Sequence, residues 1–293
     1  MAENSKIEWC HHTFNVWEGC EKVSAGCANC YAERRDKQYH GGNHWGPNGT
    51  RKMMSESYWK QPHKWNTYRM QCSLCGHWNH PADRFCHKQN CLGDERNLIL
   101  VKRPRVFCSS LADVFEDRPE LIEPRYRLFD LINETPNLDW LLLTKRPENI
   151  ERLFHNVRRH FGWDEDLSVM NIWLGTSVEN QKEKRRIDEL RSIPAWVRFL
   201  SCEPLLEDLG ELDLTGIHWV IIGGESGLNA RPMEVGWLNS IRDQCLTAGV
   251  PVFIKQMGSV YAHRKRLADS KGGDWTEWAA DHRIRQFPNA KTA

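Results

Sequence analysis

The chain has 293 residues, and its 40 lysines and arginines nearly balance its 39 aspartates and glutamates, so the formal net charge is +1. This balance excludes the strong overall basic field of many nucleic-acid-binding proteins, although a local basic patch is still compatible with it. Hydrophobic residues make up 40% of the chain, which is enough for a substantial core. Because no apolar stretch reaches about 18 residues and no apolar segment opens the chain, we expect no membrane association and a cytoplasmic location.

Three cysteines lie close together near the start of the sequence. Cys20, Cys27 and Cys30 have the spacing C-x6-C-x2-C. Three thiolates on one loop suit three irons of a [4Fe–4S] cluster, whose fourth iron is then open to a substrate or cofactor. The spacing alone also fits a structural zinc site, with a fourth ligand drawn from four nearby residues: Cys10, His11, His12 and His40. In a reducing compartment, the eleven cysteines of the chain favour metal ligands over disulfides.

The following segment carries a second cysteine group. A helix is expected over 31–39, and residues 51–99 then have the composition of a polar, Trp-rich insertion. Four cysteines of this insertion have the spacing C-x2-C-x10-C-x4-C: Cys72, Cys75, Cys86 and Cys91. Four thiolates at this spacing favour a closed structural zinc site, and the rival is a second iron–sulfur cluster. Either the basic and aromatic residues around the metal contact nucleic acid, or the metal only stabilises a small insertion.

From residue 104 onward, short apolar runs alternate with amphipathic stretches. The expected strands, including one before Cys20, are Thr13–Trp17, Arg105–Ser109, Trp140–Thr144, Ile172–Thr176, Arg198–Cys202, Trp219–Gly223 and Val252–Lys255. Helices are expected at 120–133, 147–160, 180–191 and 235–247. This alternation predicts an α/β protein with a parallel sheet. We expect an incomplete (β/α) TIM-type barrel of about six to seven strands, built from 1–50 and 100–258, with 259–293 as a C-terminal extension.

Almost every expected strand runs directly into polar residues. The residues at these strand ends are Ser109, Ser110 and Asp113; Lys145 and Arg146; Thr176, Ser177 and Glu179; Glu203; Glu225; and Lys255 and Gln256. Helix N-capping explains one polar residue at each junction, but it explains neither the Lys145-Arg146 pair nor a glutamate at three junctions. Because the carboxyl ends of barrel strands meet on one face, we expect these residues to share a functional face.

Motifs in a fixed order give the chain a family resemblance. They are Asn15-Val-Trp-Glu-Gly-Cys20, Gly26-Cys-Ala-Asn-Cys-Tyr31, Leu143-Thr-Lys-Arg-Pro147, Gly175-Thr-Ser-Val-Glu179, Ser201-Cys-Glu-Pro-Leu205, Gly223-Gly-Glu-Ser-Gly227, Ala230-Arg-Pro-Met233 and Phe253-Ile-Lys-Gln256. Together they resemble a family of phage-encoded proteins described only as a domain of unknown function. That family is similar to radical S-adenosylmethionine (SAM) enzymes and, distantly, to spore photoproduct lyase. Two features depart from the usual radical SAM loop: the first gap has six residues instead of three, and Asn29 replaces an aromatic residue.

The resemblance implies a cofactor and a reaction class. Cys20, Cys27 and Cys30 would bind a [4Fe–4S] cluster with SAM on its open iron, and an external electron donor such as flavodoxin would reduce it to yield a 5′-deoxyadenosyl radical. The implied SAM contacts are Ser109, Ser110, Asp113, Lys145, Thr176, Ser177 and Glu179, and the implied substrate contacts are Arg146, Glu203, Glu225, Lys255 and Gln256. The implied substrate is a nucleobase, a modified thymidine or other pyrimidine in phage DNA, changed by an isomerase, aminomutase or lyase step in the host cytoplasm.

Two other classes of function remain open from the residues. One is a non-catalytic nucleic-acid-binding protein that carries two zinc sites. The other is a zinc hydrolase on a barrel, which would need histidine and carboxylate ligands at the strand ends. We rank the hydrolase last because the expected strand ends are poor in histidine.

Overall fold

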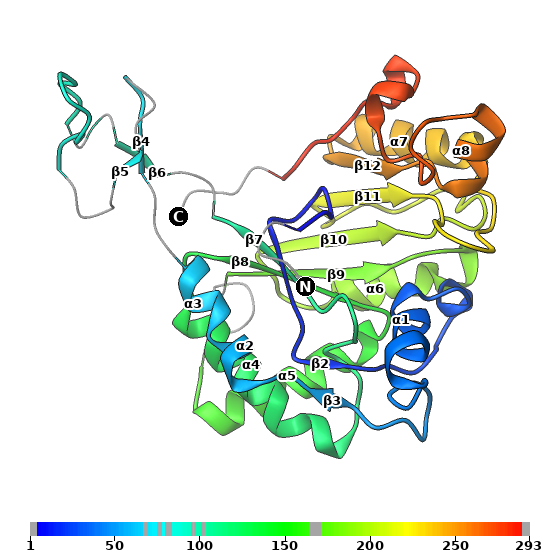
Figure 1. Ribbon diagram of the computed structural model, residues 1–293, viewed down its shortest axis with the longest axis horizontal. Coiled ribbons are helices and arrows are strands. Elements are labelled where there is room, and N and C mark those ends of the chain that lie inside the picture. The colour runs from blue at the N-terminus through cyan, green and yellow to red at the C-terminus, as the bar shows by residue number, and fades with distance from the viewer. Residues whose placement is uncertain are drawn as a thin grey trace.

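The computed structural model describes residues 5–66, 70–74, 78–79, 84–94, 96, 98–100, 103–164 and 171–288. Its centre is a curled sheet of seven parallel strands in the order β1-β7-β8-β9-β10-β11-β12 (Figure 1). The strands are β1 (His12–Phe14), β7 (Arg105–Cys108), β8 (Asp139–Thr144), β9 (Ile172–Ser177), β10 (Val197–Cys202), β11 (Trp219–Gly223) and β12 (Val252–Gln256). Within the sheet the strands follow chain order, as they do in a (β/α) barrel, and β1 and β12 are its two edges.

Helices on the outer side of the sheet connect its strands. They are α4 (Ile122–Glu134), α5 (Ile150–Phe161), α6 (Arg185–Arg191) and α7 (Val235–Ala248). Short 3-10 turns at 119–121, 147–149 and 181–184 lead into the first three. Together with these turns, the helices occupy the four ranges expected from the sequence. The expected α/β architecture, a half-barrel of parallel strands with helices outside, is therefore confirmed.

The first strand is shorter than expected. β1 ends at Phe14, and β2 (Trp17–Glu18) instead pairs antiparallel with β3 (Lys52–Met53), outside the main sheet. The chain leaves the sheet at Asn15, whose N–H donates to the Tyr58 hydroxyl at 2.9 Å. A side-chain partner thus replaces the ladder bond that would have extended β1.

Alternation along the strands divides the core into two layers. Even-numbered strand residues such as Val106 and Ile222 pack with the helices, whereas odd-numbered ones such as Phe107 and Trp219 pack on the concave side. Both sets are buried, because helices cover one face of the sheet and aromatic side chains fill the other. The parity of a strand residue therefore indicates which side of the sheet it faces.

Segments near both ends of the chain fill the concave side at the amino ends of the strands. Trp9 packs on Phe107 with ring centroids 4.6 Å apart, and it lies edge-on to Trp219 at 6.3 Å. Phe287 packs on Trp219 at 5.4 Å, and the Arg105 guanidinium lies 3.8 Å from the Phe287 ring centroid. These rings form an aromatic floor inside the half-barrel. The carboxyl ends of the strands, above this floor, are left for polar side chains.

The residues after β3 pack partly on the half-barrel. The short helices α2 (Glu56–Trp59) and α3 (Gln61–Trp65) bury Trp59 and Trp65 in the core beside β1. Beyond them, a small antiparallel sheet contains β4 (Met70–Cys72), β5 (Trp78–Asn79) and β6 (Leu98–Leu100). Among the described helices, none combines the length and apolar character needed to cross a membrane.

Candidate cofactor site at the carboxyl edge of the half-barrel

The three predicted cluster ligands lie on residues 19–31, here called the cysteine loop, which leads from β2 into α1 (Tyr31–His40) at the carboxyl ends of the strands (Figure 1). Three residues from different strand ends hold this loop. The contacts are Arg146 Nη2 to Glu21 O (2.9 Å), Ser24 Oγ to Glu179 Oε1 (2.8 Å) and Arg231 Nη1 to Ala25 O (2.9 Å). Because these partners follow β8, β9 and β11, the sheet itself sets the position of the cysteine loop.

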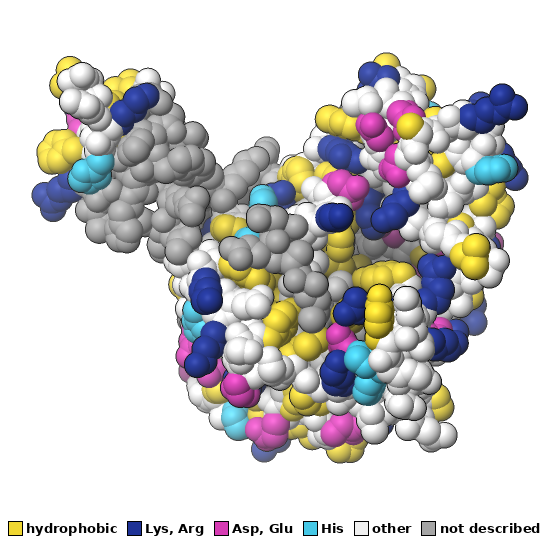
Figure 2. Space-filling view, in the orientation of Figure 1, with side chains coloured by type: hydrophobic (Ala, Val, Ile, Leu, Met, Phe, Trp, Pro, Cys, Tyr) yellow, Lys and Arg dark blue, Asp and Glu magenta, His cyan; other side chains and the backbone are white. Residues whose placement is uncertain are grey.

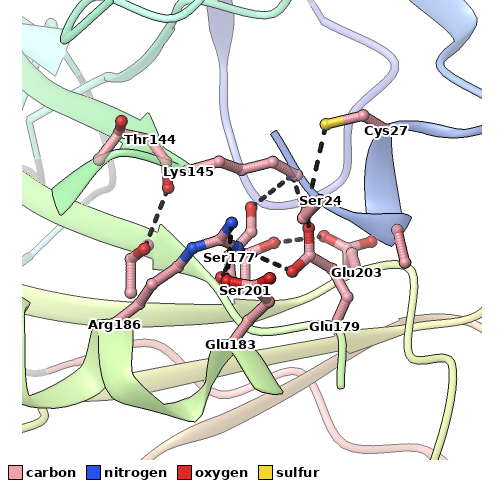
Figure 3. Close-up of polar contacts among 12 residues, drawn as sticks. Ser24, Cys27, Thr144, Lys145, Ser177, Glu179, Glu183, Arg186, Ser201 and Glu203 are labelled. Atoms are coloured by element: carbon pink, nitrogen blue, oxygen red, sulfur yellow. Dashed lines mark hydrogen bonds and ion pairs between the residues drawn. The ribbon is translucent and has the colours of Figure 1, made fainter. Parts of the chain in front are cut away.

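Glu179 is the central anchor of the cysteine loop (Figure 3). Its side chain is fully buried, and both of its oxygens have partners, Ser24 on Oε1 and Arg186 on Oε2 at 2.8 Å. A Cβ atom on Gly26 would lie 2.6 Å from Glu179 Cγ. Glycine at this position therefore lets the backbone of the cysteine loop rest directly on the carboxylate.

A second anchor connects Cys20 to the segment after β7. Arg146 Nη1 lies 3.6 Å from Cys20 Sγ and 3.0 Å from Asp113 Oδ2. Buried Asp113 also accepts hydrogen bonds from the Thr144 hydroxyl at 2.7 Å and the Lys145 N–H at 3.0 Å. Both oxygens of Asp113 are thus engaged within the protein. Asp113 fixes the Arg146 guanidinium, which in turn contacts the Cys20 sulfur.

The third anchor comes from the segment after β11. Glu225 accepts from Asn29 Nδ2 at 3.0 Å and from two nitrogens of Arg231 at 2.9 and 2.6 Å. Asn29 also donates to the Asn229 carbonyl at 2.8 Å. This amide stands where an aromatic residue is usual in radical SAM loops. Here it bridges the cysteine loop to the loop at 225–231.

The thiols are half-buried and share the edge with two cations. Burial raises the pKa of Cys20 to about 12, nearby carboxylates add to the effect, and Arg146 only partly opposes it. Burial also raises the pKa of Cys30. Burial lowers the pKa of Lys145, but the charges of Glu179, Cys27 and Cys30 together outweigh this effect, so the net shift is upward. Without a metal, the Cys20 and Cys30 thiols are therefore protonated at neutral pH, and a metal that binds them displaces protons.

The chemistry of this donor set suits an iron–sulfur cluster. Among the described residues, no three Cys, His, Asp or Glu side chains are already grouped as metal ligands. The cysteine loop nevertheless offers three soft thiols beside Lys145 and Arg146, whose charges oppose that of a thiolate-bound cluster. The alternative fourth zinc ligands lie elsewhere: Cys10, His11 and His12 at the amino end of β1, and His40 against Glu18 at 3.4 Å. The loop therefore fits a three-thiolate cluster better than a four-ligand zinc site.

Further polar side chains face the concave side above the aromatic floor. Lys255 Nζ lies 2.9 Å from Glu203 Oε1, and the Ser201 hydroxyl donates to Oε2 at 3.4 Å. This ion pair joins β10 to β12 across β11, where a Cβ on Gly223 would lie 2.6 Å from Glu203 Oε1. The two charged side chains are 22% and 14% exposed, so the pair is partly accessible.

The predicted strand-end residues divide into two groups. Most of them lie around the cysteine loop or on the concave side: Asp113, Lys145, Arg146, Ser177, Glu179, Glu203, Glu225 and Lys255. Others bond locally: Thr176 Oγ1 donates to Thr144 O at 3.1 Å, and Gln256 Nε2 donates to Gly224 O at 2.6 Å. Ser109 is buried beside Cys108, and the Ser110 carbonyl accepts from the Tyr31 hydroxyl.

Sequence reasoning missed three residues that hold the cysteine loop. Asn29, Arg186 and Arg231 were not among the predicted site residues. Arg231 lies in the Ala230-Arg-Pro-Met233 motif, so a signal for it was present. Arg186 lies on α6, seven positions after Glu179, and nothing in the sequence distinguishes it from its neighbour Arg185.

The second cysteine group is described only in part. Cys75 lies outside the described residues, and of Cys72 only the backbone is described. Cys86 and Cys91 lie on a turn closed by an antiparallel bridge between Phe85 and Asp94. The zinc site of the insertion therefore stays a prediction.

An open groove is present at the opposite edge of the sheet. Residues 210–218 and 247–251, which precede β11 and β12, form most of its lining. No cysteine lines this groove. We therefore place the candidate chemistry at the carboxyl edge, where the three cysteines lie.

Fold and site together define a parallel α/β half-barrel with a three-cysteine loop anchored across its carboxyl edge. The chain belongs to the DUF5131 family, described as proteins of unknown function, whose family model matches residues 4–283. Neither a curated protein nor a solved structure matches the chain.

Proposed function

We propose that this protein is a radical SAM enzyme that uses a [4Fe–4S] cluster. The observation that supports this most directly is the position of Cys20, Cys27 and Cys30 on one loop anchored across the carboxyl edge of the half-barrel. Barrel enzymes carry their chemistry at this edge. Three protein thiolates leave one iron of the cluster open to SAM. The bound cluster and SAM would supply a 5′-deoxyadenosyl radical, which abstracts hydrogen from the substrate.

In this proposal the protein's own side chains position the reactants and exclude water. Asp113, Glu179 and Glu225 fix the cysteine loop, and they do so through partners that are already in place. Lys145 and Ser177, which bond to each other at 2.8 Å on the concave side, are the proposed contacts to SAM. The Lys255–Glu203 pair would orient the substrate, and the aromatic floor below it would keep water out.

We further propose a nucleobase as the substrate, a pyrimidine in phage DNA, changed by an isomerase or lyase step. The family resemblance supports this choice. Tyr31 supports it too, because this residue is 55% exposed beside Cys30 although its hydroxyl is bonded to the Ser110 carbonyl, and an aromatic ring can stack on a base. An external donor such as flavodoxin would supply the electron. In the insertion, we propose that zinc binds four thiolates: Cys72, Cys75, Cys86 and Cys91.

The test is anaerobic reconstitution of the full chain with iron and sulfide. The wild-type protein is expected to gain the broad visible absorption of a [4Fe–4S] cluster and, with SAM and dithionite, to form 5′-deoxyadenosine. Cys27→Ala should abolish both results. Cys245→Ala is the control, because that thiol is buried in the apolar core on α7. A wild-type protein that takes up zinc and no iron would be the non-catalytic binding protein, and the enzyme proposal would be wrong.

A further inference from the structure

Two basic arms flank the cysteine loop. The first is on α1, where Arg34, Arg35 and Lys37 are exposed. The second is at the end of α8 (Ser259–Lys265), where Arg264, Lys265 and Arg266 are exposed. Figure 2 shows Lys and Arg side chains over α1 and at the outer margin of α8. The whole chain has a net charge of only +1, so this concentration of cations at one edge is a local feature.

The two arms are joined by the loop after β11. Arg34 Nη1 donates to the Leu228 carbonyl at 3.2 Å, and the Gly227 N–H donates to Ser259 Oγ at 3.0 Å. Gly227 also has a positive φ of 97°, and a Cβ there would lie 2.9 Å from Arg34 Nη2. The loop at 227–228 thus contacts Arg34 of the first arm directly, and it contacts the start of α8, the helix whose end carries the second arm.

Several of these cations have no acidic partner. Among the described residues, ion pairs are recorded for Lys37 with Glu33 and for Arg264 with Glu234, but none for Arg35, Lys265 or Arg266. Helix-end stabilisation accounts for cations in the last turn of α8. It does not account for Arg35, which lies in the middle of α1.

Two large apolar side chains are exposed near the first arm, one at the start of α1 and one in the loop after β11. Leu228 is 79% exposed and Tyr31 is 55% exposed. The Tyr31 hydroxyl bonds to the Ser110 carbonyl, which fixes the ring beside the segment after β7. Cations on two sides of an exposed ring suit a ligand whose phosphates lie apart and whose base lies between them.

We propose that the two basic arms bind the phosphates of a DNA strand on either side of one base that is turned toward Tyr31. The proposal rests on the proposed function for its choice of DNA as the polyanion. An enzyme that acts on a base must take it out of the duplex or use a single strand, and phosphate contacts on both sides keep it in place. An acidic protein, such as an electron donor, is the competing occupant of this surface.

The experiment measures binding of a fluorescent single-stranded oligonucleotide to the full chain by anisotropy at several salt concentrations. The arm variant is Arg35→Ala, Lys265→Ala and Arg266→Asn combined, with asparagine chosen because residue 266 has a φ of 56°. The matched control removes three exposed arginines of the outer helices: Arg127→Ala, Arg159→Ala and Arg185→Ala. Both variants lose three exposed positive charges; the control also loses the ion pairs of Arg127 with Glu56 and of Arg185 with Glu189.

The arm variant should bind more weakly, and its plot of log affinity against log salt should flatten by about 2, because each lost phosphate contact to a single strand removes roughly 0.7 from the slope. The control variant should keep the wild-type affinity and slope. Equal losses in the two variants, or no loss in the arm variant, would overturn the proposal, as would an arm variant that keeps DNA binding but loses binding of flavodoxin. Formation of 5′-deoxyadenosine without DNA is measured separately, so a failure of the proposed function is distinguishable from a failure of this surface.

Discussion

Arg186 and Arg185 are adjacent arginines of one helix that should differ sharply in their contribution to stability. The Arg186 side chain is 1% exposed and pairs with Glu179 at 2.8 Å and Glu183 at 3.1 Å, both of which are buried. Arg185 is 53% exposed, and it pairs with Glu189 at 2.7 Å and Glu183 at 3.5 Å. The two side chains therefore have the same charge and a similar number of ion pairs, but they differ in burial.

Arg186→Met should destabilise the protein strongly. Removing one partner of a buried ion pair costs about 3–5 kcal/mol, because a charge is left buried without compensation. Lys145 remains 3.5 Å from Glu179 and offsets part of this loss, so we expect the lower end, about 3 kcal/mol. Arg185→Met should cost at most about 1 kcal/mol, since the Arg185 guanidinium is exposed and buried Glu183 keeps its pair with Arg186. Urea denaturation followed by tryptophan fluorescence gives both free energies of unfolding.

A combined variant separates the loss of charge pairing from the loss of packing. Combining Arg186→Met with Glu179→Gln and Glu183→Gln removes the buried charges that Arg186→Met leaves unpaired, so part of the lost stability should return. Equal destabilisation by Arg186→Met and Arg185→Met would refute the reasoning, because burial would then not decide the energy. A full loss that persists in the combined variant would also contradict it, by assigning the effect to lost packing rather than to charge.

Two further substitutions test other parts of the fold. Burial raises the pKa of Asp139 to about 6, against an ordinary value of 3.8, so this carboxyl favours folding while it is protonated. Its contribution to stability is full below about pH 4 and is lost as the pH rises through 6. Asp139→Asn should therefore stabilise the protein on the order of 2 kcal/mol at pH 8 and much less at pH 4. Urea denaturation at both pH values measures this, and equal gains at the two would contradict it. Gly26→Ala should displace the cysteine loop from Glu179 and lower the iron retained after reconstitution, because the new Cβ would lie 2.6 Å from Glu179 Cγ. Gly236→Ala on α7 is its control, since a Cβ there meets nothing within 4 Å. If Gly26→Ala retains as much iron as the control, Gly26 does not have this role.

The fold could be predicted from the sequence because its signals are local. Apolar runs such as Trp219–Gly223 and Val252–Gln256 are buried strands, and the amphipathic stretches between them are helices. β1 was predicted too long, because the hydrogen bond from Asn15 to Tyr58 joins residues 43 positions apart. No local pattern records such a contact.

The roles of the site residues are harder to predict from the sequence, because polar residues at strand ends can serve either a ligand or the protein itself. Asp113 and Glu179 were expected to contact SAM, and in the structure their oxygens are occupied by Arg146, Arg186 and Ser24. These partners come from other strand ends, from the outer helices and from the cysteine loop. The sequence indicates that carboxylates gather at this edge, but only the folded chain determines which of them remain available.

These carboxylates restrain the cysteine loop, and this restraint explains how a loop with a long first gap is compatible with a cluster. A first gap of six residues would leave the cysteine loop free to adopt many conformations, and ordering it costs conformational entropy. Glu179, Asp113 with Arg146, and Glu225 with Asn29 restrain it from three directions before any metal binds. Burial then keeps the Cys20 and Cys30 thiols protonated, so iron binding would be coupled to proton release and would favour the folded state. The anchors, rather than the cysteine spacing, therefore preorganise the site. Loss of an anchor should weaken iron binding even though all three cysteines remain.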